Sequence, residues 1–278
     1  MRLARNLGIA MSLVAGIFYF SVRNAAADQL GFAVDATGSL YSVDLTTATA
    51  TSIGSTGQLI EGLAISPQGS LFGTDFLGNL FSVSGTTGAS TLIGNTGVGD
   101  IEGLSFNGTT LIGTNFSNLG GPTTIYAINT STAVPTAVTS FSQGPVRAMA
   151  VVNPNTIDVA SDSPVSQSLV QVNLLNGTNT VLGQLPSAGA ALIAALNFGS
   201  DGTLYALDPF GNEFIIASNG AGTLVGNTGG QNWLDLTMAS TTLPGAVPEP
   251  GSMALLLTAA LGLISVRAWQ RSGGSAQN

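Results

Sequence analysis

The sequence predicts an all-β fold, a five-bladed β-propeller built from four-stranded antiparallel blades. Three observations support this fold class. First, residues 32–44 recur as residues 72–84, and repeats of about 40–45 residues that each hold four strands are typical of propeller blades. Second, four short strand-like pieces can be followed through the repeats, each in five copies. Third, the chain enters the first repeat at its second piece, and the missing first piece comes last, at residues 235–239.

The first piece of each unit is a short apolar run that usually begins with glycine or alanine. Its copies are residues 62–66, 103–107, 148–152, 195–199 and 235–239. The second piece ends in Asp or Asn, at residues 32–35, 72–75, 112–115, 159–162 and 205–208. In both pieces the residue types are those enriched in strands, and turn-forming Gly, Pro, Asn and Asp separate them.

The third piece occupies residues 40–44, 80–84, 125–129, 169–173 and, less regularly, 213–217. The fourth piece is rich in threonine and surrounds Ile53, Ile93, Val138, Val181 and Val225. A first blade assembled from both ends of the chain would close the ring and remove its open sheet edges. The alternatives are a six-bladed ring with an irregular blade within residues 118–143, for which the insertion at 118–122 is short, and an open β-solenoid.

The body of the chain, residues 28–246, contains no Lys, His or Cys and only one Arg, Arg147, but every acidic residue except Glu249. Such an acidic surface repels phosphate, which argues against nucleic-acid binding. Without His or Cys there is no Ser-His-Asp or Cys-His catalysis and no zinc site of the usual kind. Carboxylate chemistry remains: hydrolysis of glycosidic bonds by paired acids, or calcium binding by oxygen ligands.

The N-terminus is predicted to be a signal peptide, residues 1–27. Arg2 and Arg5 precede an apolar run, and Ala25 and Ala27 form a small-residue cleavage site. An uncleaved N-terminal anchor is the alternative. The exported propeller domain would then span residues 28–239.

The C-terminus reads as a second targeting segment. After a linker at 240–246 come Val247, Pro248, Glu249 and Pro250, an uncharged apolar run to residue 266, and a basic end with Arg267 and Arg271; a polar tail fills 272–278. The apolar run would rise about 25 Å as a helix, close to a hydrocarbon core of about 30 Å. An ordinary C-terminal membrane anchor is one reading of it.

This order of motif, helix and basic tip in residues 247–271 resembles the PEP-CTERM sorting signal of Gram-negative bacteria. The resemblance implies processing by an exosortase near Pro248 to Pro250. It also implies export through the inner membrane, transient anchoring there, and delivery to the cell surface or the extracellular matrix of a biofilm.

Candidate site residues gather at one end of the predicted ring. Glu61 and Glu102 directly precede first strands, and Arg147 holds the equivalent position in a further unit. Because neighbouring strands are antiparallel, these residues should share a face with the Asp or Asn residues that end the second strands. The candidates for a sugar or Ca²⁺ site are Glu61, Asp75, Glu102, Asp35 and Asp208. The structural interpretation of the aspartates is that each opens a type I turn with Gly three residues on. The structural interpretation of Glu61, Glu102 and Arg147 is a solvated rim of the ring.

The aromatic residues fall into two groups. Those at repeat positions are expected to pack between blades: Phe32, Tyr41, Phe72, Phe81, Tyr126, Tyr205 and Phe214. Those outside the pattern are candidate platforms for stacking sugars: Phe76, Phe116, Phe210 and Trp233.

The function we expect from the sequence is adhesion, or contact with glycan or surface proteins, by a non-catalytic propeller at the cell surface or in the matrix. No cofactor other than Ca²⁺ is expected. An extracellular polysaccharide hydrolase or lyase that uses Glu61 and Glu102, or the aspartates, is the first alternative. A structural spacer without a ligand is the second.

Overall fold

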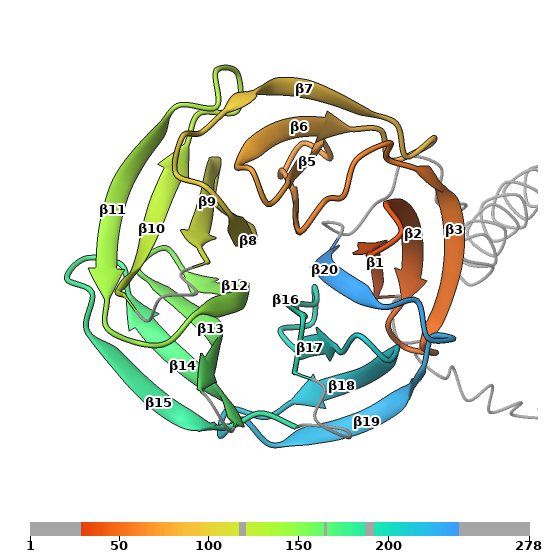
Figure 1. Ribbon diagram of the computed structural model, residues 1–278. Helices are drawn as coiled ribbons and strands as arrows, with labels where there is room; N and C mark the ends of the chain where they lie inside the picture. Colours follow the sequence, from red (N-terminus) through yellow and green to blue (C-terminus); the bar gives the residue numbers. More distant parts are fainter. Residues whose placement is uncertain (1–28, 117–120, 164–165, 187–191, 239–278) are drawn as a thin grey trace, which may run out of the picture.

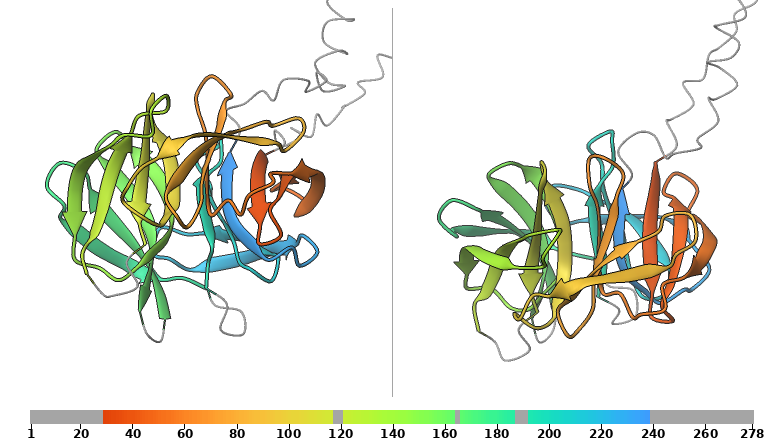
Figure 2. Two further views of the ribbon diagram at one scale, coloured as in Figure 1. Left: turned by 45° about the horizontal axis from the view of Figure 1, so that its top comes forward. Right: turned by 90° about the horizontal axis from the view of Figure 1, so that it is seen from above.

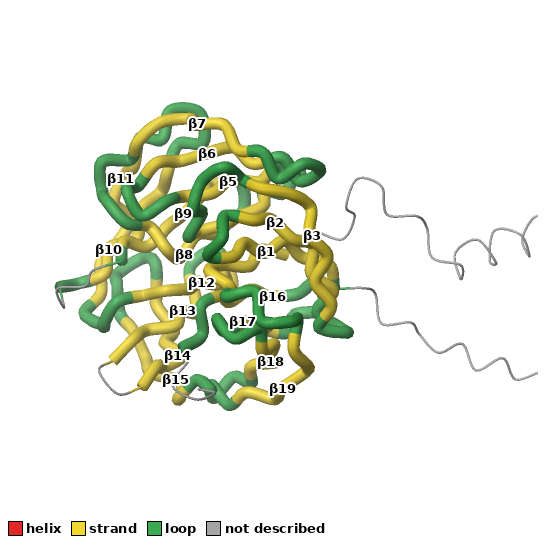
Figure 3. The backbone as a smooth tube through the Cα atoms, turned by 45° about the vertical axis from the view of Figure 1, so that its right-hand side comes forward, coloured by secondary structure: helices red, strands yellow, loops and turns green. Residues whose placement is uncertain are grey.

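The computed structural model describes residues 29–116, 121–163, 166–186 and 192–238. Every regular element in these ranges is a β-strand (Figure 3). No helix within them is long and apolar enough to cross a membrane. The predicted signal peptide with Ala25 and Ala27, the linker and the sorting segment all lie outside the described residues.

The twenty strands form five four-stranded antiparallel sheets arranged around a common axis, which confirms the five-bladed propeller (Figure 1). Blade 1 comprises, from inner to outer strand, β20 (Trp233–Met238), β1 (Leu30–Asp35), β2 (Ser39–Asp44) and β3 (Thr49–Ser55). Blade 2 comprises β4 (Gly62–Ile65), β5 (Leu71–Thr74), β6 (Asn79–Val83) and β7 (Ser90–Asn95). Blade 3 comprises β8 (Ile101–Asn107), β9 (Thr110–Asn115), β10 (Thr123–Ile128) and β11 (Pro135–Phe141).

Blades 4 and 5 repeat this arrangement. Blade 4 comprises β12 (Val146–Asn153), β13 (Thr156–Ser163), β14 (Ser166–Asn173) and β15 (Asn179–Gln184). Blade 5 comprises β16 (Ala195–Phe198), β17 (Leu204–Leu207), β18 (Asn212–Ile216) and β19 (Gly222–Asn227). Neither a sixth blade nor an open solenoid is present among the described residues.

The ring closes in blade 1, as the repeat phase predicts. The last strand, β20, pairs antiparallel with the first, β1, from Gly31↔Met238 to Asp35↔Trp233, and the two lie side by side in Figure 2. A ladder of backbone hydrogen bonds therefore joins the first and the last strand of the described residues, and the two middle strands of blade 1 are paired on both sides.

The hydrophobic core lies between the blades. Five clusters of buried side chains each combine residues of two consecutive blades, for example Phe32 of blade 1 with Leu63 and Leu71 of blade 2. The aromatic residues at repeat positions pack into these clusters, as predicted, and Phe72 meets Phe106 of the next blade with ring centroids 5.7 Å apart. Every blade thus depends on both neighbours for burial of its apolar faces.

One strand register predicted from the sequence is wrong. The repeat pattern predicts that Asp162 ends the second piece of blade 4, as Asp75 does in blade 2. Instead Ser161 holds the ladder position that Asn115 holds in blade 3, and Asp162 lies one residue further along. The physical reason is that β13 does not turn there but stays paired with β14 to its end. A shift of one residue in a strand moves the side chain to the other face, which gives Asp162 a different role.

Candidate functional site

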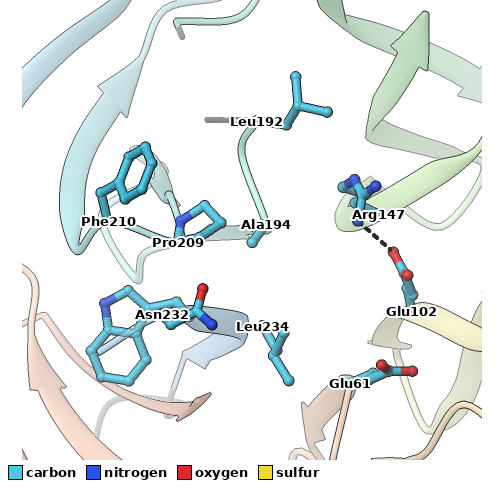
Figure 4. A pocket seen from close by; sticks show the side chains of 10 residues that line it. Glu61, Glu102, Arg147, Leu192, Ala194, Pro209, Phe210, Asn232 and Leu234 are labelled. Atoms are coloured by element: carbon cyan, nitrogen blue, oxygen red, sulfur yellow. Dashed lines mark ion pairs between the residues drawn. The ribbon is translucent and has the colours of Figure 1, made fainter. Parts of the chain in front are cut away.

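The inner strands of all five blades begin at the same face of the ring, and the residues at their starts line one cavity of about 330 Å³ (Figure 4). We call it the mouth cavity. One residue at the same repeat position comes from each blade: Glu61, Glu102, Arg147, Ala194 and Leu234. Glu61 and Glu102 therefore share a face of the ring, as the sequence predicts.

The mouth cavity has two unlike walls. Blades 2, 3 and 4 contribute the charged groups of Glu61, Glu102 and Arg147. Across from Arg147 and Glu102, the loop between β17 and β18 contributes Pro209 and Phe210 (Figure 4). The remaining lining residues are Leu192, Asn232 and Trp233. A ligand in this space would meet ionisable groups on one side and an apolar surface on the other.

Arg147 is held in place by three neighbours. Its Nε lies 2.7 Å from Oδ2 of Asp162, and its Nη1 lies 3.7 Å from Oε2 of Glu102. Its guanidinium also lies 5.0 Å from the ring centre of Phe116, a cation–π contact. Asp162, displaced by one residue from its predicted position, is thus the main partner of the only basic residue in the described chain.

Burial dominates the protonation of the acids at the mouth. Burial, together with the neighbouring Asp100, raises the pKa of Glu61 to about 7, although the charge of Arg147 acts in the opposite direction. Burial also raises the pKa of Glu102 to about 8, although Arg147 is close. The attraction of Arg147 is insufficient because its short contact is with Asp162 and Glu102 lies 3.7 Å away. Near neutral pH, Glu61 and Glu102 therefore carry protons for much of the time.

Asp100 is a site residue that the sequence analysis missed. Burial raises its pKa, while a hydrogen bond with Glu61 and the charge of Arg147 lower it. Glu61 Oε2 and Asp100 Oδ1 are both buried without a hydrogen-bond partner. Because two carboxylates cannot donate, this pair is joined only when one carries a proton. The available signal was spacing: Asp100 directly precedes β8 and stands two residues before Glu102.

The predicted aspartates end their strands at the mouth but turn into their own hairpins. In each, Oδ1 accepts the backbone N–H groups two and four residues on, at 2.8–3.0 Å. The pairs are Thr37 and Ser39 for Asp35, Leu77 and Asn79 for Asp75, and Phe210 and Asn212 for Asp208. Their Oδ2 atoms accept from Tyr41, Asn79 and Asn212 respectively. The turn interpretation of these aspartates is confirmed.

The structure thus divides the residues predicted for a calcium site. Glu61 and Glu102 line the mouth cavity, whereas Asp35, Asp75 and Asp208 are buried in their turns and do not line it. Across the described ranges, no group of three or more acidic side chains is arranged to hold a metal ion.

The four candidate stacking residues differ in their exposure and in their position relative to the mouth cavity. Phe210 lines the mouth cavity and is 56% exposed, as a platform should be. Phe76 is 54% exposed on the hairpin of blade 2 but does not line the cavity, and Phe116 lies against Arg147. The prediction for Trp233 is wrong. Although Trp233 is among the lining residues, its side chain is fully buried and leaves no free face for a sugar. Its Nε1 donates to Thr228 Oγ1 at 2.8 Å, and its ring packs edge-on against Tyr41.

Fold and site together define a β-propeller with a ligand-sized cavity at one mouth of its ring. No family model and no curated protein matches the sequence. Among solved structures, a chain of a nidogen/laminin complex is similar over 78% of this chain and 100% of that chain, with a TM-score of 0.53 and 12% identity. At this identity the similarity establishes the propeller fold.

Two enzyme structures show a weaker likeness. The aldose sugar dehydrogenase of Streptomyces coelicolor, in its PQQ-bound form, aligns with 57% of this chain and 59% of its own, with a TM-score of 0.43 and 12% identity. The hydrazine synthase of Kuenenia stuttgartiensis aligns with 67% of this chain and 59% of its own, with a TM-score of 0.42 and 15% identity.

Proposed function

We propose that this chain is an exported, exosortase-sorted protein of the cell surface or extracellular matrix whose propeller binds carbohydrate at the mouth cavity without transforming it. The sorting part of the proposal rests on the sequence of residues 247–271. The binding part rests on the mouth cavity itself. Its volume of about 330 Å³ is at the lower end of the range of about 300–1,000 Å³ that small ligands occupy.

The observation that carries the proposal is the contrast between the two walls of the cavity. A sugar ring has an apolar C–H face and a rim of hydroxyl groups. The exposed ring of Phe210 offers a surface for the apolar face, and Glu61, Glu102 and Arg147 offer donors and acceptors for the hydroxyl groups. A cavity with only one of these walls would be less suited to carbohydrate.

A polysaccharide hydrolase is the second candidate, favoured by two carboxyl groups with raised pKa at one cavity. Such enzymes need one protonated acid and one ionised carboxylate. Here Glu61 and Glu102 are shifted in the same direction, to about 7 and about 8, and burial raises the pKa of Asp100 as well. Assignment of acid and base roles requires pKa values that are pushed apart, so this arrangement fits binding better than catalysis.

The test is incubation of the purified full-length chain, in detergent, with exopolysaccharide from the source organism. We expect co-sedimentation with the polysaccharide and no change in its chain length. Phe210→Ala should weaken binding, whereas Phe76→Ala, which removes an equally exposed ring outside the cavity, should not. Shortening of the polysaccharide would favour the hydrolase, and absence of both binding and shortening would favour a structural spacer.

A further inference from the structure

The carboxyl groups at the mouth cavity outnumber the cations that could neutralise them. Glu61 and Glu102 line the cavity, and Asp100 lies against Glu61. Arg147, the only basic side chain of the described ranges, directs its Nε to Asp162 and its face to Phe116, and reaches Glu102 only at 3.7 Å. The charged wall of the cavity therefore has unused capacity for a cation.

Two buried oxygens at this wall lack a donor. Neither Glu61 Oε2 nor Asp100 Oδ1 has a hydrogen-bond partner, and the two carboxyl groups can bond to each other only through a shared proton. An ammonium group supplies three N–H donors and a positive charge, and charge-assisted hydrogen bonds to carboxylates are stronger than neutral ones. An ammonium placed beside Glu61 could thus replace the shared proton.

We propose that the mouth cavity selects carbohydrate with a free amino group, whose ammonium binds the carboxyl groups of Glu61 and Glu102 while the sugar ring lies on Phe210. The preferred ligand is an amino sugar without an N-acetyl group, such as a deacetylated hexosamine unit of a polysaccharide. This inference rests on the proposed function, since it presupposes that carbohydrate occupies the cavity. It adds to that function a preference for carbohydrate with a free amino group over carbohydrate without one.

The arrangement also predicts how binding depends on pH. Protons on Glu61 and Glu102 compete with the ammonium, so affinity should rise as pH approaches about 7 to 8 and binding should release protons. Affinity should fall again where the amine of the ligand loses its own proton. The charged and titratable groups that face Glu61 and Glu102 are Asp75, Asp100, Arg147, Asp162 and Asp235. Of these, only Arg147 opposes proton uptake by both glutamates.

The test compares three tetrasaccharides of equal length and linkage: glucosamine, N-acetylglucosamine and glucose oligomers. Binding to the full-length chain in detergent is measured by calorimetry between pH 5 and 9, in two buffers of different ionisation enthalpy. We expect the glucosamine oligomer to bind at least about tenfold more tightly near neutral pH, with measurable proton release. Glu61→Gln and Glu102→Gln should each reduce this preference and the proton release.

The control is Asp201→Asn, which removes an exposed acid outside the mouth cavity and should leave the preference unchanged. Thermal unfolding checks that each variant is folded. Equal binding of all three oligomers would overturn the amine selectivity and leave the carbohydrate function standing, whereas absence of binding to any of them would overturn both. Tight binding of polylysine, or a Ca²⁺-specific response lost in the same glutamine variants, would replace the amino sugar with a peptide or a metal ion.

Discussion

At the residue scale, the most unusual side chain is Glu213 in β18. In three other blades the same ladder position is leucine opposite glycine: Leu40↔Gly54, Leu80↔Gly94 and Leu169↔Gly183. Glu213 faces Gly226 in the same way, is completely buried, and neither carboxyl oxygen has a hydrogen-bond partner. Burial, aided by the charge of Asp44, raises its pKa to about 8.

We predict that Glu213→Leu stabilises the protein, and more so at alkaline pH. The folded pKa lies above the unfolded value of 4.5, so folding retains a proton and stability is lost as pH rises from 4.5 through about 8. This costs at most about 1.4 kcal/mol per pH unit in that window. Leucine fits the position, as the other blades indicate, and the melting temperature at pH 9 should rise by roughly 5–10 °C.

The control for this prediction is Asp201→Asn, which replaces an exposed acid and should change the melting temperature little. A variant Glu213→Leu with an unchanged or lower melting temperature at pH 9 would show that Glu213 has a partner in the folded protein that compensates its burial.

What the sequence could predict at this scale depends on how local the interaction is. The turns at Asp35, Asp75 and Asp208 involve residues two and four positions away, so the pattern Asp-x-x-Gly was sufficient. The contact between Glu61 and Asp100 joins two blades. The burial of Trp233 arises only when the ring closes, so composition alone gave no indication of it.

At the element scale, side chains as well as backbone join the ends of the ring. Strand β20 faces β4 of the next blade, where the N–H of Leu63 donates to Oδ2 of Asp235 at 2.6 Å and the N–H of Ile65 donates to Oγ1 of Thr237 at 3.0 Å. These backbone donors belong to an inner strand edge that no sheet partner covers. The side chains of Asp235 and Thr237, two residues apart in β20, thus accept the hydrogen bonds that a neighbouring strand would otherwise accept.

We predict that Thr237→Val, which keeps the shape of the side chain, destabilises the protein by about 1–3 kcal/mol because the N–H of Ile65 loses its acceptor. The melting temperature should fall by roughly 2–10 °C. The matched control is Thr223→Val on the outer strand β19, where the side chain is exposed and little change is expected. Equal effects of the two substitutions would indicate that the hydrogen bond between Ile65 and Thr237 contributes nothing specific to stability.

The strand pieces and the phase of the repeat could be read from the sequence because hydrophobic pattern and turn residues recur in every unit. The register of β13 could not. Asp162 and Ser161 are both polar and stand next to each other, and only the pairing with β12 and β14 decides which of them ends the repeat. The prediction thus failed where two adjacent residues fit the pattern almost equally well.

At the scale of the whole molecule, the sorting segment makes a prediction independent of the propeller. If Pro248, Glu249 and Pro250 are read by an exosortase, their replacement by alanine should leave a full-length species in the membrane fraction of the producing cells. The parent chain should be shortened and should leave that fraction, as immunoblots of fractionated cells can measure. Equal loss of the tail in variant and parent would leave an ordinary anchor as the better explanation.

The folded protein as a whole should be more stable in acid than in alkali. Burial raises the pKa of six acids, namely Glu61, Asp100, Glu102, Asp158, Glu213 and Asp235, and lowers that of none. Each of them holds a proton in the folded state over a pH range in which the unfolded chain has released it. Their contributions to the free energy of unfolding are fully present below the unfolded pKa values, near 4, and are lost as the pH rises through the folded pKa values. For Glu61, Glu102 and Glu213 these folded pKa values are about 7 to 8.

We therefore predict that the melting temperature falls steadily between pH 5 and pH 9, as calorimetry at constant ionic strength would measure. Glu61 and Asp100 contribute less than Glu213, because water screens their half-buried groups. Asp44 acts in the opposite direction, since hydrogen bonds from Thr46 and Thr47 outweigh its burial and lower its pKa, but it is a single group. Glu213→Gln combined with Glu102→Gln should flatten the profile between pH 5 and pH 8, and a melting temperature that rises toward pH 9 in the parent would contradict the protonation of these buried acids.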